Sequence, residues 1–276
     1  MLPMTRRSPR RPRRASGDGR VRELLLPESG ASVTVRSTPG PEAPDAPVFV
    51  LVHGIGMSHR YFDRMHAELA ATGAVHSVDL PGFGRSPKPA DGVSIEQYAD
   101  YLGELLPMLS GRPVVLVGHS MGAQFVTETA VRHPTVVAHL VLIGGVTDPT
   151  RSSALRQALA LGRDTLKEPV NGTMIVVRDY LLCGPRWYLA TLRPMLAYRT
   201  DLRLREVYAP TLVIRGEDDP VSRHDWGVHL AAQATRGKLL ELPGRHLVHF
   251  SAAVDTAAGI REYARTAAPD GEPVTP

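Results

Sequence analysis

Ser120 is the residue of this 276-residue chain whose neighbours most favour nucleophilic chemistry. It lies in the pentapeptide Gly118-His119-Ser120-Met121-Gly122, which follows the apolar run Val114 to Val117 and precedes a helical pattern. A G-x-S-x-G turn between a strand and a helix is so tight that side chains at both glycines would clash, while the serine is strained and its Oγ is exposed. An ordinary serine N-cap explains the helix start but not the paired glycines. The pattern predicts a nucleophile elbow.

Four more motif-bearing stretches accompany the elbow in a fixed order. In chain order they are His53-Gly54-Ile55-Gly56, Asp79-Leu80-Pro81-Gly82-Phe83-Gly84-Arg85-Ser86, Arg215-Gly216-Glu217-Asp218-Asp219-Pro220 and Leu242-Pro243-Gly244-Arg245-His246. Together with the elbow they resemble the motifs of the α/β-hydrolase superfamily, namely H-G-x-G, D-x-P-G-x-G-x-S, G-x-x-D and a histidine after the last strand. The resemblance covers roughly residues 20 to 265.

The resemblance implies a catalytic triad of Ser120, Asp219 and His246, in the chain order that this fold uses. The register of the G-x-x-D turn selects Asp219 over Asp218. A serine hydroxyl is a poor nucleophile at neutral pH, so His246 would take its proton and later return it to the leaving group. Asp219 would fix the tautomer of His246 and stabilise the imidazolium.

The resemblance also implies an oxyanion hole made by the backbone N–H groups of Ile55 and Met121. The H-G-x-G segment would then be the oxyanion loop, formed by His53, Gly54 and Gly56. His53 is expected to order this loop by hydrogen bonding. The D-x-P-G-x-G-x-S turn is interpreted as structural.

Other residues compete for these roles. His249 lies three residues after His246, but the loop after the strand, rather than the following helix, is expected to deliver the base. Asp148 lies just past the apolar run that ends at Ile143, where some members of the family carry the acid. His119 is expected to pack beside the elbow and not to act as a base.

The elements that must position these residues are indicated by short apolar runs and helical patterns. A hairpin is predicted over Val21 to Leu26 and Ala31 to Arg36, and helical segments alternate with the apolar runs, as in a mainly parallel sheet with helices on both faces. The expected fold is the α/β-hydrolase fold, with an eight-stranded sheet and an inserted helical cap. Further strands are predicted at Val48 to Val52, Ala74 to Val78, Val114 to Val117, Leu140 to Ile143, Thr211 to Ile214 and Leu239 to Leu242. Helices are predicted at Tyr61 to Thr72, Ser94 to Ser110, Met121 to His133, Ser222 to Arg236 and Val254 to Arg265, with capping boxes beginning at Ser94 and Ser222.

The chain divides into a core and three other parts. We predict a disordered Arg/Pro-rich tail over residues 1–20, a hydrolase core over 21–147 and 209–266, a helical cap over 148–208 and a flexible C-terminus over 267–276. Aromatic and large apolar side chains of the cap either line a substrate pocket or pack within the cap. These side chains are Trp187, Tyr188, Met195 and Tyr198.

The basic charge belongs to the tail. The chain has a formal charge of +4, and its first 22 residues contain eight arginines and one aspartate, so they carry +7 and the rest carries −3. An acidic body gives no electrostatic footprint for nucleic acid, and no apolar run reaches membrane-spanning length. The single cysteine, Cys183, cannot form an internal disulfide, and no zinc-ligand spacing occurs. We expect a cytoplasmic protein without metal, cofactor, nucleic-acid or membrane partner.

The predicted function is hydrolysis of a small, partly apolar carboxylic ester by a cofactor-independent serine esterase. Carbon–carbon bond hydrolases and lactonases of the same fold keep the serine, so they form the enzymatic alternative. A protein that uses the pocket only for small-molecule recognition is the second class, and decayed motifs would be expected there. All the motifs quoted above are intact in this chain.

Overall fold

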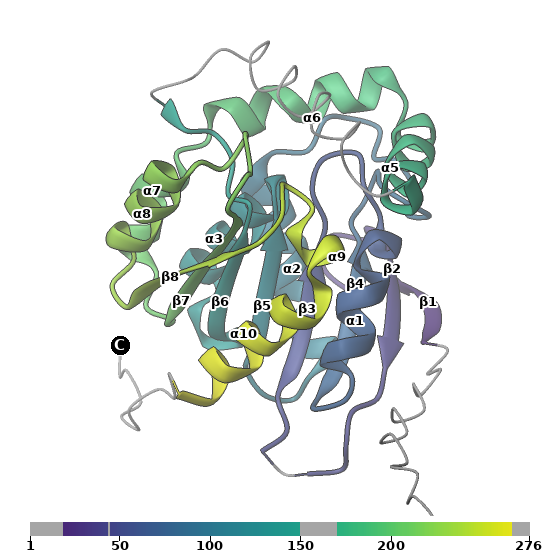
Figure 1. Ribbon diagram of the computed structural model, residues 1–276. Helices are drawn as coiled ribbons and strands as arrows, with labels where there is room; N and C mark the ends of the chain where they lie inside the picture. Colours follow the sequence, from purple (N-terminus) through teal and green to yellow (C-terminus); the bar gives the residue numbers. More distant parts are fainter. Residues whose placement is uncertain (1–18, 44, 150–169, 267–276) are drawn as a thin grey trace, which may run out of the picture.

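A computed structural model describes residues 19–43, 45–149 and 170–266 of the chain. One eight-stranded sheet forms its centre, with the strand order β1-β2-β4-β3-β5-β6-β7-β8 (Figure 1). β1 and β2 form an antiparallel hairpin, β2 pairs antiparallel with β4, and all the other pairs are parallel. The strands are β1 (Arg20–Leu25), β2 (Ser32–Thr38), β3 (Val48–Val52), β4 (Ala74–Asp79), β5 (Val114–His119), β6 (Val137–Ile143), β7 (Thr211–Gly216) and β8 (Gly237–Leu242).

The predicted eight-stranded, mainly parallel sheet is confirmed. β3, β5 and β6 are almost wholly buried, as their mostly apolar sequences require when helices cover both faces of a sheet. Parallel strands end at one edge of the sheet, and the loops that follow β3, β5, β7 and β8 therefore gather there. These are the loops that carry the predicted site residues.

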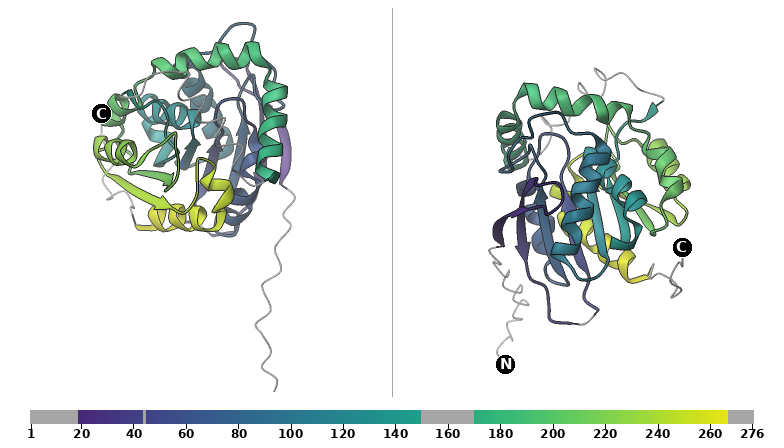
Figure 2. Two further views of the ribbon diagram at one scale, coloured as in Figure 1. Left: turned by 45° about the horizontal axis from the view of Figure 1, so that its top comes forward. Right: turned by 180° about the vertical axis from the view of Figure 1, so that it is seen from behind.

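Helices cover both faces of the sheet. One apolar core contains side chains of α2, α3 and α8, and a second core contains those of α1, α9 and α10. Figure 1 shows α1 and α10 in front of the sheet, and the right panel of Figure 2 shows the opposite face. These helices are α1 (Asp63–Leu69), preceded by the 3-10 turn η1 (His59–Phe62), α2 (Ile95–Leu109), α3 (Met121–Arg132), α8 (His224–Gln233), α9 (Val248–Ser251) and α10 (Ala253–Thr266), with η2 (Pro134–Val136) leading into β6.

One of the two predicted capping boxes forms. Ser94 accepts the backbone N–H of Gln97 and the Gln97 side chain accepts the N–H of Ser94, which confirms the box at α2. The box at Ser222 is wrong, because α8 begins two residues later, after Arg223. Asp219 is the reason: its Oδ1 accepts the N–H of Ser222, so this segment forms a turn around the carboxylate before the helix begins.

The segment between β6 and β7 contributes helices above the carboxyl ends of the strands (Figures 1 and 2). Within the described residues these are α5 (Val170–Cys183), α6 (Pro185–Ala197), α7 (Thr200–Arg203) and the turn η4 (Leu204–Glu206). Residues 150–169 of the predicted cap, residues 1–18 of the predicted tail and residues 267–276 of the predicted C-terminal segment lie outside the described residues. α5 and α6 are called the cap helices below.

Candidate active site

Ser120 lies at the turn from β5 into α3. Its backbone has a φ of 56°, in the left-handed region that side chains other than glycine rarely adopt. A Cβ at Gly118 would lie 2.3 Å from the carbonyl oxygen of Gly122, and a Cβ at Gly122 would lie 2.4 Å from that of Val52. The turn is therefore possible only with glycine on both sides of the serine. The Ser120 N–H donates to the carbonyl of Ile143 at 2.9 Å, which ties the turn to β6.

Asp219 and His246 form a buried pair beyond the ends of β7 and β8. Nδ1 of His246 lies 2.9 Å from Oδ2 of Asp219, whose Oδ1 accepts the N–H groups of Val221 and Ser222. Burial alone would raise the carboxyl pKa, but the attraction and hydrogen bond of His246 and the two backbone donors hold the pKa of Asp219 below its usual value. The ionised carboxylate keeps the proton of His246 on Nδ1, so Nε2 is the basic nitrogen.

The His246 ring lies beside the elbow. A Cβ at Gly144 would come within 3.1 Å of this ring, and Gly144 directly follows Ile143, whose carbonyl accepts the Ser120 N–H. The ring of His119, the residue before Ser120, has its centroid 4.8 Å from that of His246. The three proposed triad residues therefore come from three neighbouring loops at one edge of the sheet.

The competing acids and base occupy different places. Asp218 is exposed and Asp148 is buried after β6, while the carboxylate that contacts His246 belongs to Asp219. His249 is fully buried in α9, where the centroid of its ring lies 4.2 Å from that of His119 and 4.6 Å from that of Tyr61. Neither ring nitrogen of His249 has a hydrogen-bond partner in the described part of the chain. Burial, and then the His119 and His246 rings, lowers the pKa of His249 far below 6.5, so it packs as a neutral ring.

The H-G-x-G segment lies directly against the elbow. A Cβ at Gly54 would lie 3.0 Å from the Ser120 Cβ, which is a tight contact, so the segment packs closely on the elbow. Nε2 of His53 accepts the N–H of Leu80 at 3.1 Å, which leaves the proton on Nδ1 to be donated to the carbonyl of Gly54 at 2.8 Å. Burial lowers the pKa of His53, although Asp79 opposes the shift, so the neutral ring braces the loop. The two proposed oxyanion donors, Ile55 and Met121, are both buried.

A chain of three hydrogen bonds, not anticipated from the sequence, joins this loop to the candidate base. The N–H of Gly54 donates to the Tyr61 hydroxyl at 2.7 Å, and that hydroxyl donates to Nδ1 of His119 at 3.0 Å. Nε2 of His119 then donates to the backbone carbonyl of His246 at 2.9 Å. Burial, and then the His246 ring, lowers the pKa of His119 to about 3, so the ring stays neutral and this tautomer persists. Tyr61 and His119 are 58 residues apart, and no sequence motif links them.

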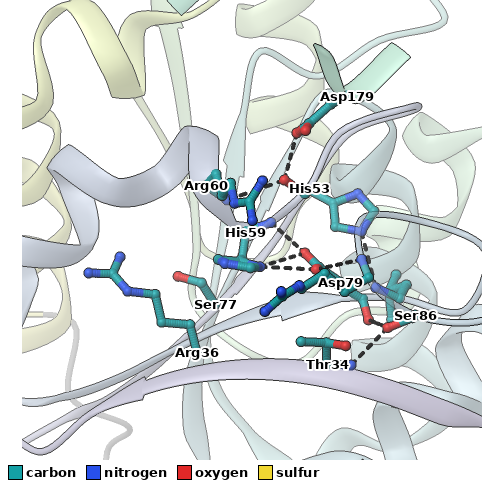
Figure 3. A network of polar contacts seen from close by, with 12 residues as sticks. Thr34, Arg36, His53, His59, Arg60, Ser77, Asp79, Ser86 and Asp179 are labelled. Atoms are coloured by element: carbon teal, nitrogen blue, oxygen red, sulfur yellow. Dashed lines mark hydrogen bonds and ion pairs between the residues drawn. The ribbon is translucent and has the colours of Figure 1, made fainter. Parts of the chain in front are cut away.

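Asp79 holds the second motif turn together (Figure 3). Its carboxylate binds Nδ1 of His59 at 2.9 Å and accepts the N–H of Arg85, while Ser86 Oγ donates to its backbone carbonyl. A Cβ at Gly84 would lie 2.3 Å from this carboxyl group. The turn is thus built around one buried aspartate, and Figure 3 also shows Asp179 approaching the same region.

The cap helices rest on the loops of the site. Oδ2 of Asp179, in α5, accepts the Ser58 hydroxyl at 2.6 Å, and Ser58 is the N-cap of η1. The Tyr180 ring, also in α5, lies so close to Gly56 that a Cβ there would come within 2.5 Å of it. Trp187, in α6, packs on Gly82 so closely that a Cβ at Gly82 would lie 2.3 Å from the indole ring. α5 and α6 therefore bear directly on the oxyanion loop and on the Asp79 turn.

The four large cap side chains singled out in the sequence have different surroundings. The Tyr188 ring packs 5.5 Å from that of Tyr180, above the oxyanion loop, whereas Met195 and Tyr198 belong to the apolar core on the α2 and α3 side of the sheet. The Tyr198 hydroxyl donates to Glu128 in α3 at 2.8 Å. Met195 and Tyr198 thus fasten the cap to the core.

Comparison with known proteins places the chain in a family. Residues 49–259 match the Alpha/beta hydrolase family. The (E)-2-((N-methylformamido)methylene)succinate hydrolase of Acinetobacter baylyi is 28% identical over 231 residues, which span 74% of this chain and 84% of that enzyme. Two solved structures share the fold. E-2-(acetamidomethylene)succinate hydrolase has a TM-score of 0.76 at 21% identity, covering 90% of this chain and 100% of that one. The enol-lactonase from Burkholderia xenovorans has a TM-score of 0.75 at 20% identity, and the match covers 88% of this chain and 100% of that one. The chain belongs to the alpha/beta hydrolase family.

Proposed function

We propose that the chain is a serine hydrolase that cleaves a small, partly apolar carboxylic ester through an acyl-enzyme on Ser120. The observation that carries this proposal is the buried hydrogen bond between Asp219 and His246 beside the strained elbow. It keeps the proton on Nδ1, so Nε2 is the nitrogen that serves as general base. The intact oxyanion loop supports a catalytic role over a purely binding one.

The proposed reaction begins when Nε2 of His246 takes the hydroxyl proton of Ser120 and Oγ attacks the substrate carbonyl carbon. The negative charge that forms on the carbonyl oxygen is bound by the N–H groups of Ile55 and Met121. The bond to the leaving alkoxide then breaks, and His246 returns the proton to it. Water, deprotonated by His246, attacks the acyl-enzyme in the second half, which releases the acid and restores the Ser120 hydroxyl.

A second candidate is a lactonase or a carbon–carbon bond hydrolase that uses the same three residues. The names of the relatives favour it, because an enol-lactonase and hydrolases of substituted methylene succinates act on substrates other than simple esters. Both candidates share the nucleophile, the base and the acid. They differ in the group that leaves the acyl carbon.

A substrate panel tests both candidates. We would measure turnover of p-nitrophenyl and aryl esters of graded acyl length beside lactones and vinylogous diketones, with wild type and Ser120→Ala in parallel. The ester proposal predicts the highest kcat/KM for a short or medium acyl ester and loss of turnover in Ser120→Ala. A higher kcat/KM for a lactone or diketone selects the second candidate. Binding without turnover throughout the panel contradicts both.

A further inference from the structure

The outward face of α5 is apolar. Met174, Val177, Leu181 and Leu182 are each at least half exposed. Met174, Val177 and Leu181 stand three and four residues apart, so they share one side of the helix. We call these four residues the cap apolar face. Large contiguous apolar surfaces on folded proteins mark interaction sites, whereas single exposed apolar residues are ordinary.

The exposed side of α5 differs from that of an ordinary surface helix. A helix that covers a core turns apolar residues inward and charged residues outward. In α5 the buried side includes Val176, Cys183 and the carboxylate of Asp179, whereas its exposed side carries the four apolar residues and a single charge, Arg178. The carboxylate of Asp179 accepts a hydrogen bond from Ser58, so this polar contact helps to hold the inward side of α5 on the core. The exposed apolar side chains take no part in that packing and are available to a binding partner.

Within the described residues, the exposed charged side chains of the cap helices have one sign. Arg178, Arg186 and Arg193 are exposed on the cap helices, and the acid of these helices, Asp179, is buried. Lys88 joins them at the end of α5, where its Nζ donates to the carbonyl of Leu182 at 3.4 Å. Apolar side chains flanked by arginine and lysine match the interface of an anionic lipid bilayer, where acyl chains meet negatively charged headgroups.

We propose that the cap apolar face docks on the surface of a bilayer that contains anionic phospholipids. The apolar side chains enter the boundary between headgroups and acyl chains, and the arginines pair with phosphate groups. Among the described helices, none is long and apolar enough to cross a bilayer, so the contact is interfacial. This proposal differs from the expectation, drawn from the sequence, of a protein without a membrane partner.

A second copy of the chain fits this face less well. In a two-fold symmetric dimer the same patch meets itself, so the cationic residues of one copy would approach those of the other. Such pairs would repel, whereas an anionic headgroup layer neutralises all of them at once. The cap helices also lie at the periphery of the described part of the molecule, over the carboxyl ends of the strands (Figure 2).

The proposed docking would bring lipid close to the candidate site. The inward side of α5 holds Tyr180 on Gly56 and Asp179 on Ser58, and Gly56 directly follows Ile55, a proposed oxyanion donor. One helix would therefore separate the bilayer surface from the oxyanion loop. The docking proposal itself stands on the face and its charges and does not require Ser120 to be the nucleophile.

Co-sedimentation with lipid vesicles tests the proposal on the full chain. We would compare vesicles of phosphatidylcholine with vesicles that also contain phosphatidylglycerol, using wild type, Leu181→Ser and the matched control Leu25→Ser. Leu181 is 78% exposed and Leu25, on the edge strand β1, is 68% exposed, so neither substitution opens a core. Because the basic first 22 residues are common to all variants, their attraction to anionic vesicles cancels in the comparison.

We expect Leu181→Ser to weaken partitioning into the anionic vesicles by about tenfold and Leu25→Ser to leave it unchanged. Arg178→Gln is expected to weaken it by about fivefold, beside the control Arg265→Gln on α10, because each cation near an anionic surface contributes to binding. Equal binding of Leu181→Ser and Leu25→Ser, or equal binding of wild type to both kinds of vesicle, would overturn the proposal.

A fluorescence measurement separates lipid from other occupants of the face. The chain has one cysteine, so Cys183→Ala combined with Leu181→Cys takes a single environment-sensitive nitrobenzoxadiazole label, and Cys183→Ala with Leu25→Cys is the control. The label at position 181 should shift to shorter emission wavelengths when anionic vesicles are added, and the label at position 25 should not. An emission that vesicles leave unchanged means that no lipid contacts the face, and a concentration-dependent shift without vesicles would identify a second copy instead.

Discussion

Nε2 of His119 donates a hydrogen bond of 2.9 Å to the backbone carbonyl of His246. The residue before the proposed nucleophile therefore holds the loop of the proposed base. Because Nδ1 of the same ring is bonded through Tyr61 to Gly54, one neutral side chain connects the elbow, the base loop and the oxyanion loop. Their relative positions are set by a buried hydrogen-bond chain as well as by the sheet.

Tyr61→Phe tests this chain, because it removes only the hydroxyl. The N–H of Gly54 and Nδ1 of His119 would both lose their partner, at a cost of about 1–3 kcal/mol for each unsatisfied buried group. We expect kcat on an ester substrate to fall by about tenfold with little change in KM, as for a group that positions the machinery without binding the substrate. Tyr208→Phe, at an exposed tyrosine, is the control. A lower melting temperature with unchanged kcat would reduce Tyr61 to a purely structural role.

Substitution of the two neighbouring histidines should separate their roles. His246→Ala is expected to lower kcat by several orders of magnitude, as removal of a triad base does. His249→Leu is expected to keep kcat within a few fold of wild type, because its ring packs against the rings of Tyr61, Phe62 and His119. Steady-state kinetics on one ester, with kcat compared between wild type and the two variants, measures this difference. The opposite ranking of the two variants would transfer the role of base to His249.

His249→Leu should also stabilise the protein. Both nitrogens of this fully buried ring lack a hydrogen-bond partner among the described residues, and an unpaired buried polar group costs free energy. Leucine supplies a similar volume without polar atoms, so we expect the free energy of unfolding to rise by about 1 kcal/mol. Urea denaturation monitored by circular dichroism measures it. Destabilisation by a comparable amount would indicate that the imidazole makes a polar contact.

Acid should destabilise the fold through buried histidines. Burial, and then Arg36 and His76, lowers the pKa of His66 to about 3, whereas an unfolded histidine titrates near 6.5. Between these two values the unfolded chain binds a proton that the folded chain does not. The free energy of unfolding therefore falls with falling pH by about 1.4 kcal/mol per pH unit from this residue, and the loss ends below the folded pKa.

The variant His66→Gln measures this contribution. Its amide can still reach Ser77 and Thr38, which bind the two ring nitrogens of His66, but it cannot take up a proton. We expect the slope of the unfolding free energy against pH between pH 4.5 and 6 to decrease by about one proton equivalent. Equal slopes in wild type and His66→Gln would show that His66 is protonated in the folded protein.

The parts of the fold that could be predicted are those encoded locally. Runs such as Val48–Val52 are apolar at every position, which is the pattern of a strand covered on both faces. The paired glycines of the elbow indicate a tight turn that leaves no room for a Cβ at either position. The start of α8 could not be predicted in this way. Ser222 has the sequence of a helix cap, but the carboxylate of Asp219 takes its backbone N–H, and that contact depends on tertiary structure.

The residues that hold the loops of the site in place could not be predicted from sequence patterns either. Tyr61 and His119 meet because the fold brings η1 to the carboxyl end of β5, and Asp179 meets Ser58 across 121 residues. Hydrogen bonds between residues so far apart in the chain produce no characteristic spacing that could be recognised in a single sequence. The motif residues could be found because each lies at the end of a strand, where local sequence fixes the turn.

Labelling by a fluorophosphonate tests the central claim most directly. Such a probe phosphonylates a serine only where a base activates the hydroxyl and an oxyanion hole receives the phosphoryl oxygen, so it reports the assembled site without knowledge of the substrate. Intact-mass and peptide mass spectrometry of the folded protein should show one adduct, on Ser120, that is absent from Ser120→Ala and strongly slowed in His246→Ala. A folded wild-type protein that forms no adduct, or forms it equally fast without His246, would contradict the proposed serine hydrolase.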